Sequence, residues 1–390
     1  MNNLLRDTLA ERAAGAEPPP LDLDAIVAAG NRQISRRRAI GVLGGAVAAA
    51  AAVIGTATVV RPRESQPQPA KPAPFAERRV TYALGSTIHY GDEILSVAPL
   101  RITAFVQTDA GFVFLDEGND IHVADRSGTR KLGAAASWEL TADFRGNLVG
   151  WIDPLKIPNE SVVYDVLAGR ELVRTAVGNK LPPTVDLAYS PRIIAIDGGT
   201  AYLDTAHGPY RWDIQANRGD FLTGVGMNAV RAVAAGQIVF QQPLEQRPPA
   251  VNLTIAKSVT EKPSVRFVGQ QAHLSPTAEY VVTQPDDARP DVQPPWTHLH
   301  LTATKSGNRI ALPDQTYSKF YFGQWIDDET CTIAAEYPKT GVLDLLVVNA
   351  RTGATKVAVS QLTTLNFSTT PPRVANLALP TGRQIIDLFA

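Results

Sequence analysis

Short apolar runs alternate with polar punctuation along most of this chain. From residue 78 onward, runs of four to six residues rich in Val, Ile, Phe and Tyr are separated by Gly, Asp, Asn and Pro. This pattern is typical of β-strands joined by tight turns. No long stretch has the spacing of an amphipathic helix. The sequence therefore predicts an all-β domain over residues 78–390, with strands in runs such as Ile102–Val106, Gly111–Leu115, Leu148–Ile152, Ser161–Val166, Arg192–Ile196, Gln237–Gln241, Tyr280–Thr283 and Leu343–Val348.

A different pattern precedes this domain. Ala39–Val60 is 22 residues long without a charge or a Pro, and it directly follows Arg36, Arg37 and Arg38. At about 1.5 Å per residue, a helix of this length spans roughly the 30 Å core of a bilayer. We expect residues 36–60 to form an arginine-flanked transmembrane helix. A cleaved signal peptide is the alternative; it is less favoured because the apolar run is long and begins nearly 40 residues into the chain.

These patterns divide the chain into four parts. Residues 1–35 are expected to form a cytoplasmic helical tail ahead of the membrane helix at 36–60. Residues 61–77 hold five prolines, which predicts an extended, semi-rigid spacer. Because arginines before a membrane helix favour the cytoplasmic side, we expect a single-pass protein of the cell membrane. Its N-terminus would be cytoplasmic, and residues 78–390 would be extracytoplasmic.

A turn pattern recurs within the β-rich domain. Asp165 is followed four residues later by Gly169, and Asn349 by Gly353, each pair between two strand-like runs. An Asp or Asn side chain can cap such a turn, and Gly readily supplies a positive φ. Further turns of this kind are expected at Asp125 and Gly128, at Asp213 and Asn217, and at Gly307, with a degenerate one near Thr260–Lys262.

The spacing of these turns predicts a β-propeller. They recur about every 45 residues once the degenerate turn is counted, and a repeat of about 45 residues with four short strands is typical of propeller blades. Residues 80–390 hold about seven such units, with six or eight as alternatives. Since only six turns are visible, we expect a composite blade made of Val80–Val97 and Val374–Phe389. Such a blade closes the ring and leaves no open sheet edge.

The turns at Asp165–Gly169 and Asn349–Gly353 resemble those of WD40-like and TolB-like propellers. The Gly-His and Trp-Asp hallmarks of WD40 repeats are largely missing, apart from Trp212-Asp213. The whole chain, with its arginine triplet, its Pro-rich spacer and the run Tyr82–Gly91, is similar to uncharacterised actinobacterial membrane-anchored propellers. The resemblance implies a propeller repeat domain on a membrane anchor, and it implies no activity.

Few residues suggest a reaction or a metal. His298 and His300 are separated by one residue in a strand-like run, so both imidazoles are expected on one face, where two metal ligands could lie. Histidines on a polar face are the favoured interpretation, because the only further candidate ligand is the distant His273. The lone cysteine, Cys331, is expected to be a buried strand residue.

Other chemical signatures are missing from the sequence. There is no G-x-S-x-G elbow and no Gly-rich phosphate loop, so we expect no cofactor. The net charge of −1 gives no electrostatic argument for nucleic acid. We therefore expect a non-enzymatic scaffold that binds a protein or glycan partner at its loops or its central channel. A propeller enzyme of the lyase or glycosidase type, with channel-lining His and Asp residues, is the alternative. A signal transmitter using residues 1–35 is a third hypothesis.

Overall fold

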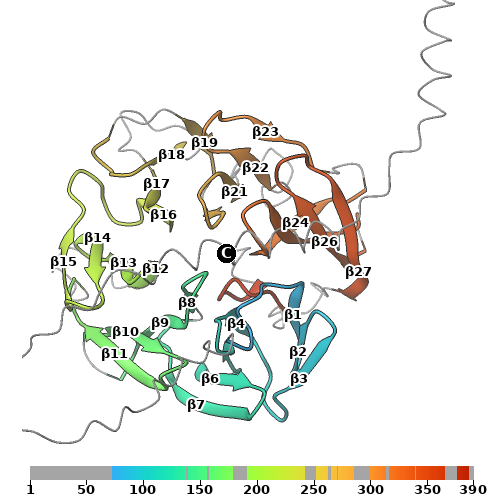
Figure 1. Cartoon of the computed structure of the whole chain (residues 1–390), viewed down its shortest axis with the longest axis horizontal. Helices are drawn as coiled ribbons and strands as arrows, with labels where there is room; N and C mark the ends of the chain where they lie inside the picture. Colours follow the sequence, from blue (N-terminus) through green and yellow to red (C-terminus); the bar gives the residue numbers. More distant parts are fainter. Residues whose placement is uncertain are drawn as a thin grey trace, which may run out of the picture. The chain divides into compact units, whose positions relative to one another are not determined.

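The computed structural model describes residues 73–385, apart from residues 138, 270 and 339 and the segments 156–157, 179–190, 242–251, 262–264, 285–298, 313–315 and 365–375. The described residues form 28 strands in seven four-stranded antiparallel sheets. Figure 1 shows these sheets as blades around a central axis. The fold is thus an all-β propeller, and the prediction of seven blades is confirmed.

Every blade uses the same strand order from the axis outward. Blade 1 is β28 (Leu377–Ala378), β1 (Thr81–Leu84), β2 (Thr87–Tyr90) and β3 (Glu93–Ser96); blade 2 is β4 (Ala104–Gln107), β5 (Phe112–Leu115), β6 (Asp120–Asp125) and β7 (Gly128–Ala134); blade 3 is β8 (Thr141–Ala142), β9 (Leu148–Asp153), β10 (Glu160–Asp165) and β11 (Arg170–Thr175); blade 4 is β12 (Arg192–Asp197), β13 (Thr200–Thr205), β14 (Gly208–Asp213) and β15 (Arg218–Phe221). Blade 5 is β16 (Val230–Ala234), β17 (Gln237–Gln241), β18 (Asn252–Ala256) and β19 (Arg266–Val268); blade 6 is β20 (Gln271–Leu274), β21 (Tyr280–Gln284), β22 (His300–Ala303) and β23 (Arg309–Ile310); blade 7 is β24 (Lys319–Trp325), β25 (Thr330–Glu336), β26 (Val342–Asn349) and β27 (Thr355–Thr364).

The ring is closed by the composite blade that the sequence predicted. β28 pairs antiparallel with β1, with Ala378 opposite Ala83 and Leu377 opposite Leu84. In Figure 1 the blue strands β1–β3 lie between blade 2 and the red strands of blade 7. Both residues of β28 are almost fully buried. Two chain ends that are distant in sequence are therefore held in one sheet, which leaves blade 1 with a paired inner strand.

Burial follows the position of each strand within its blade. β5, with the sequence FVFL, is buried at all four positions, whereas the outer strand β7 is exposed at its first four. A middle strand is packed on both faces because neighbouring blades stack face to face, so its apolar run is continuous and does not alternate. Trp151, Trp212 and Trp325 are also core residues of these strands, and Cys331 is fully buried in β25, as the sequence predicted.

The packed domain begins before residue 78. Phe75 is fully buried, its ring lies 5.4 Å from that of Tyr90 and 5.0 Å from that of Phe112, and its N–H donates to the carbonyl of Asp109. The end of the segment predicted as a spacer therefore belongs to the propeller core, and the expected boundary at residue 78 cuts through it. The proposed tail, the apolar segment and Arg36–Arg38 lie outside the described residues. Within the described ranges, no helix is long and apolar enough to cross a bilayer.

The repeat turns share one place in the fold. Those at Asp125, Asp165, Asp213, Gly307 and Asn349 all connect the third and fourth strands of a blade. The carboxylate of Asp165 accepts a hydrogen bond from the N–H of Ala168 at 2.9 Å, and the amide oxygen of Asn349 accepts one from Thr352 at 3.0 Å. The turn residues with positive φ are Gly128 (130°), Gly169 (67°), Asn217 (48°), Gly307 (73°) and Gly353 (75°).

The C-terminal segment after β28 lies against the inner strands of two other blades. The N–H of Gly382 donates to the carbonyl of Phe105, and the carbonyl of Gly382 accepts from Leu140, both at 2.8 Å. Gly382 has a φ of 77°, and a Cβ there would lie 1.9 Å from the carbonyl oxygen of Leu140. Only Gly allows so close an approach. This contact brings the next residue, Arg383, to the channel wall, where it forms a bridge with Glu139.

Candidate binding site in the central channel

The propeller axis holds a cavity of about 530 Å³. Its wall comes from the inner strands β4, β8, β12, β16, β20 and β24 and from the segment Pro380–Arg383. This volume is within the range of sites that bind small molecules or single side chains of a partner. The channel is therefore the place where the described blades jointly surround a space, and the side chains in its wall decide what it can hold.

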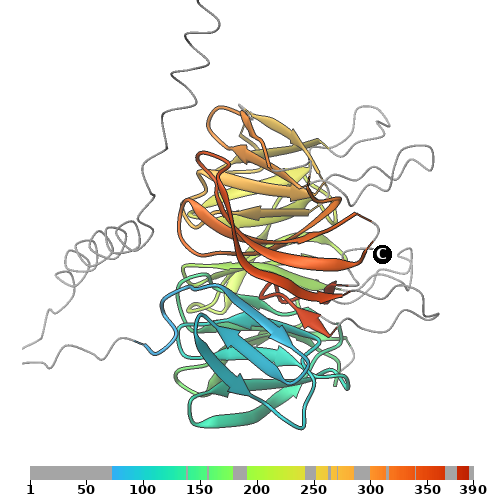
Figure 2. The same ribbon diagram turned by 90° about the vertical axis from the view of Figure 1, so that its right-hand side faces the viewer.

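The channel has two chemically different ends. Because each blade repeats one strand order, the inner strands run in the same direction between the two faces of the ring seen edge-on in Figure 2. Arg192 and Arg231 lie where β12 and β16 begin. Arg383 is close enough for its positive charge to lower the pKa of Arg231. We call this end the arginine mouth. Arg78 and Asp143 lie where β4 and β8 end, and we call that end the Asp143 mouth.

At the arginine mouth, Arg231 has few partners. Its Nη2 donates to Oε1 of Gln241 at 3.2 Å, while its Nε is buried and has no hydrogen-bond partner among the described residues. The pKa of Arg231 is lowered to about 10, mainly by burial; the positive charges of Arg192 and Arg383 contribute to the lowering, and Asp204 opposes it. A buried donor without a partner costs about 1–3 kcal/mol, so this guanidinium is held at an energetic disadvantage.

Arg192 and Arg383 are only partly neutralised. Nε of Arg192 lies 3.4 Å from Oδ2 of Asp204, without the geometry of a hydrogen bond, and its Nη2 donates to Oδ1 of Asn228 at 3.3 Å. Nε of Arg383 lies 3.4 Å from a carboxylate oxygen of Glu139. Burial raises the pKa of Asp204 despite the N–H of Asn228 and the nearby arginines. Asp204, the ion-pair partner of Arg192, is thus less readily ionised than an ordinary aspartate.

At the Asp143 mouth, Arg78 has several partners. Its Nη1 donates to Oδ1 of Asp109 at 3.0 Å and to the carbonyls of Phe75 at 2.9 Å and Ala76 at 3.3 Å, and its Nη2 donates to the carbonyl of Phe144. The side chain is only 4 % exposed. Arg78 therefore ties the N-terminal segment to blades 2 and 3, and its donors are used within the domain.

Asp143 and His273, which also line the channel, have shifted pKa values as well. Burial raises the pKa of Asp143 to about 6. Burial, aided by the charge of Arg383, lowers the pKa of His273 to about 3. The His273 ring stacks on Phe322 with centroids 4.3 Å apart. A His with so low a pKa stays neutral at pH 7 and is a poor general base, so its ring acts as an apolar wall.

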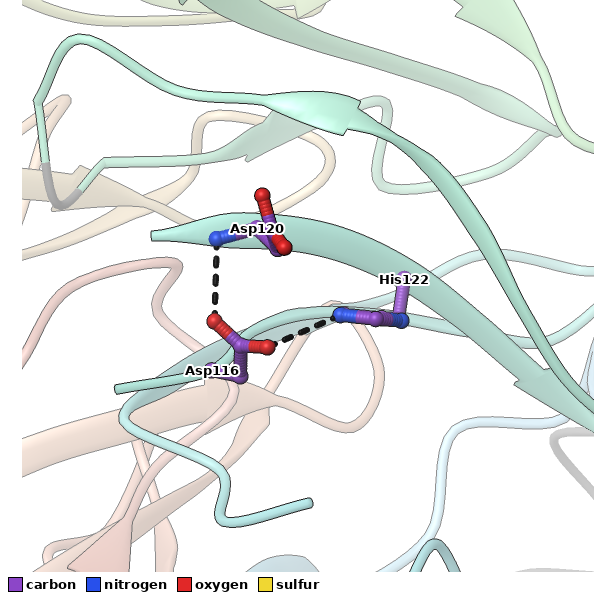
Figure 3. Close-up of side chains that lie close together, drawn as sticks. All are labelled: Asp116, Asp120 and His122. Carbon is purple, nitrogen blue, oxygen red and sulfur yellow. Dashed lines mark hydrogen bonds and ion pairs between the residues drawn. The ribbon is translucent and has the colours of Figure 1, made fainter. Parts of the chain in front are cut away.

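Outside the channel, Asp116, Asp120 and His122 lie close together at the hairpin between β5 and β6, and their ligand atoms are within 4.8 Å of one another. Figure 3 shows that the carboxylate of Asp116 lies between the other two residues. One of its oxygens accepts the N–H groups of Gly118 and Asp120, each at 2.9 Å. The other lies 3.0 Å from Nε2 of His122, and Asp120 pairs with Lys131. These contacts stabilise the hairpin and account for the closeness of the three side chains without a metal ion.

The predicted histidine pair is only partly within the described residues. His298 lies outside them, and His300 begins β22. His273 lies on β20, two strands away across β21, and strands two positions apart are about 9–10 Å apart. Neither His273 nor His300 belongs to a group of three possible ligands within the described ranges. The metal hypothesis at His298 and His300 therefore gains no support, and it remains a prediction.

The arginine mouth was not predicted from the sequence. Its three arginines are widely separated in the chain, and no local motif joins them. One signal was present: Arg192 and Arg231 both stand at the start of an inner strand, in consecutive blades, ahead of an apolar run. Aligning the repeats of the two blades could have shown that these two arginines occupy similar positions. Arg383 could not have been added, since it reaches the channel only through the contact of Gly382 with β4 and Leu140.

Comparisons with known proteins agree on the fold alone. No protein-family model and no curated protein sequence matches this chain. Among solved structures, TolB from Acinetobacter baumannii is 11 % identical, with a TM-score of 0.42, over 76 % of this chain and 65 % of that one. Hsv2 from Kluyveromyces lactis is 13 % identical, with a TM-score of 0.39, over 64 % of this chain and 74 % of that one. The Dos1 propeller is 10 % identical, with a TM-score of 0.41, over 72 % and 79 %. Similarity at this level does not extend to function.

Proposed function

We propose that this protein is a membrane-anchored, extracytoplasmic binding scaffold that presents the arginine mouth of its propeller to a protein or glycan partner. A closed ring of seven blades is a rigid support, and loops at one face of such a support are common binding surfaces. The arginine mouth supplies a concave, positively charged entrance to the channel. The apolar surface beside it supplies contact area.

The observation that carries this proposal is the set of exposed apolar side chains around blade 4. Phe221 is 40 % exposed at the end of β15, and Met227 is 43 % exposed just before β16. Val177 is 38 % exposed and follows β11. By strand direction, all three positions lie on the face of the ring where the arginine mouth opens, Phe221 and Val177 at outer strands and Met227 near an inner one. Met227 directly precedes Asn228, which accepts a hydrogen bond from Arg192. Apolar side chains gathered beside arginines are typical of binding surfaces.

The channel chemistry favours binding over the enzyme alternative. Glycoside hydrolysis usually needs two carboxylates on either side of the bond, and Asp143 is the only carboxylate in the described channel wall. The only histidine there, His273, is stacked on Phe322 and stays neutral at pH 7. Arginines outnumber acids in the wall, which suits the binding of an anionic group.

The anchor and the orientation rest on Ala39–Val60 and on the arginine triplet before it. A cysteine-labelling experiment tests both. Leu155 is 78 % exposed. The native cysteine, Cys331, is fully buried and burial raises the pKa of its thiol, so it should not react with the label. We expect Leu155→Cys to react with a membrane-impermeant maleimide in intact cells, and Thr8→Cys to react only after lysis. Labelling of Leu155→Cys only after lysis would contradict the proposed orientation.

Site-specific crosslinking tests the binding surface. A photo-crosslinking amino acid is placed at Phe221 in the full-length chain, and a matched control is placed at Ile94, which is 66 % exposed on the outer strand β3. We expect a discrete crosslinked species from position 221 in cells and none from position 94. Equal crosslinking from both positions, or none from 221, would sink the proposal that the arginine mouth receives a partner.

A further inference from the structure

The charges at the arginine mouth do not balance. Three guanidiniums, those of Arg192, Arg231 and Arg383, face two carboxylates, those of Asp204 and Glu139, at ion-pair distances of 3.4 Å. Three positive and two negative charges leave one positive charge. It resides on Arg231, whose Nη2 donates to the neutral amide of Gln241 and which has no ion pair among the described residues.

The excess charge is placed where a ligand could use it. All three arginines belong to the wall of the same 530 Å³ cavity. They come from blade 4, blade 5 and the C-terminal segment, so they approach the cavity from different sides of the ring. The Nε of Arg231 is buried away from the cavity, so the Nη groups at the tip of this guanidinium are the donors that a carboxylate in the cavity could reach.

We infer that Arg192, Arg231 and Arg383 bind the carboxylate of an acidic side chain that a protein partner inserts into the channel; this rests on the function proposed above. A carboxylate brings one negative charge, which matches the one excess positive charge. A phosphate dianion brings two and would be repelled by Asp204 and Glu139. The apolar rim of Val177, Phe221 and Met227 favours a peptide in which the acidic residue stands beside apolar ones.

Trifluoroacetate, observed by fluorine NMR, is a suitable probe because it is a carboxylate of single charge. It is titrated into the full-length protein in detergent. We expect saturable line broadening that acetate reverses, that acetamide does not reverse, and that inorganic phosphate reverses no better than acetate. Tighter competition by phosphate, or broadening that does not saturate, would overturn the assignment of a carboxylate site.

Substitutions of Arg231 test whether trifluoroacetate binds at the arginine mouth. Arg231→Gln is expected to weaken binding of trifluoroacetate about tenfold or more, equivalent to about 1.4 kcal/mol, and Arg231→Lys to restore part of it because it keeps the charge and loses the fork. Arg351→Gln, at an exposed turn position between β26 and β27, is the matched control and should bind as the unmodified chain does. Equal binding by Arg231→Gln, in protein with an unchanged circular dichroism spectrum, would overturn the inference.

The crosslink from position 221 separates this inference from the proposed function. If the unmodified chain gives a crosslink to a protein and Arg231→Gln reduces it at least about tenfold, the inference holds. If the crosslink persists in Arg231→Gln, or if glycosidases rather than proteases remove the captured partner, the scaffold function stands and the inferred acidic side chain is wrong. If the unmodified chain gives no crosslink, the proposed function itself fails.

Discussion

Two arginines in the same channel wall, Arg78 buried and Arg231 half-buried, have opposite surroundings. Arg78, at the Asp143 mouth, donates to the carboxylate of Asp109 and to three backbone carbonyls. Arg231, at the arginine mouth, donates to one amide oxygen and keeps a buried Nε without a partner in the described structure. Both side chains are at least partly removed from water, so both lose hydration free energy. Only Arg78 recovers it within the domain.

The difference shows which buried charge serves the fold and which is available for a ligand. A guanidinium whose donors are filled by its own chain stabilises one arrangement of that chain. A guanidinium with open donors lowers the stability of the free protein and gains more on binding. Arg78 therefore serves the architecture, and the surroundings of Arg231 are the reason that we propose a binding role for it. Four experiments test this contrast.

The largest effect is expected at Arg78. Arg78→Ala should lower the free energy of unfolding by about 3–5 kcal/mol, because it leaves the Asp109 carboxylate and three carbonyls without their buried donor. Urea denaturation of the full-length chain, followed by circular dichroism, measures this. Arg351→Ala, at an exposed turn, is the control and should stay within about 0.5 kcal/mol. A loss below about 1 kcal/mol for Arg78→Ala would break the contrast.

The next effect is a pH dependence at the same mouth. Burial is the main reason that the pKa of Asp143 rises from 3.8 to about 6; the N–H of Arg145 opposes it, Asp197 and Asp109 add to it, and Arg78 opposes it. The folded state thus holds this proton more tightly than the unfolded state. The resulting stability is fully present below about pH 4 and is lost as the pH rises through 6.

Replacing Asp143 by Asn removes that dependence. Between pH 4 and pH 7, we expect the unmodified chain to lose about 2 kcal/mol relative to Asp143→Asn, since one pKa unit corresponds to about 1.4 kcal/mol and part of the change occurs below pH 4. Urea titrations of both proteins at four or more pH values measure the difference between their free energies of unfolding. The other acidic residues are present in both proteins, so their contributions cancel in that difference. A difference that does not change with pH would show that the Asp143 carboxyl is well solvated.

A smaller effect of opposite sign is expected at the arginine mouth. Arg231→Met removes an under-partnered buried charge and keeps an unbranched apolar side chain. The free energy of unfolding should therefore stay equal or rise by about 1–2 kcal/mol in the absence of ligand. Urea denaturation beside Arg78→Ala provides the comparison. A loss larger than about 1 kcal/mol would mean that Arg231 serves the fold as Arg78 does.

The smallest effect is a response to salt. Repulsion among Arg192, Arg231 and Arg383 contributes to the lowered pKa of Arg231, and raising NaCl from 0.1 M to 1 M shortens the screening length from about 10 Å to about 3 Å. The unmodified chain should gain up to about 1 kcal/mol more stability from this change than Arg231→Met does. Identical thermal shifts in both proteins would argue against repulsion at this mouth.

Local signals in the sequence predicted much of the fold. The Asp165 and Asn349 turns depend on a side chain bonding to its own backbone within three residues, so the pattern is visible without tertiary structure. Their spacing predicted seven blades and a composite closing blade. The corresponding turn of blade 1, at Gly91-Asp92 between β2 and β3, was not predicted because no Asp or Asn precedes its Gly. Phe75 was missed because the prolines around it predicted a spacer, while its ring packs in the core.

The site was not predictable in the same way. The hairpin carboxylates Asp116 and Asp120 were visible in the sequence, but their use by Gly118, His122 and Lys131 appears only in three dimensions. Likewise, Arg78 and Arg231 are equally charged residues in the sequence. Nothing in their neighbours along the chain says that one has four hydrogen-bond acceptors and the other has one.

The sequence by itself determined the strand pattern, the turn chemistry, the blade number and the closure of the ring, because each depends on residues a few positions apart or on their regular spacing. Only the tertiary structure decided that Arg192, Arg231 and Arg383 share one cavity and that Arg231 is left with a free donor. The physical reason is that hydrogen-bond partners and desolvation are set by what surrounds a side chain in space. In a propeller, those surroundings come from several blades and from the chain end that closes the ring.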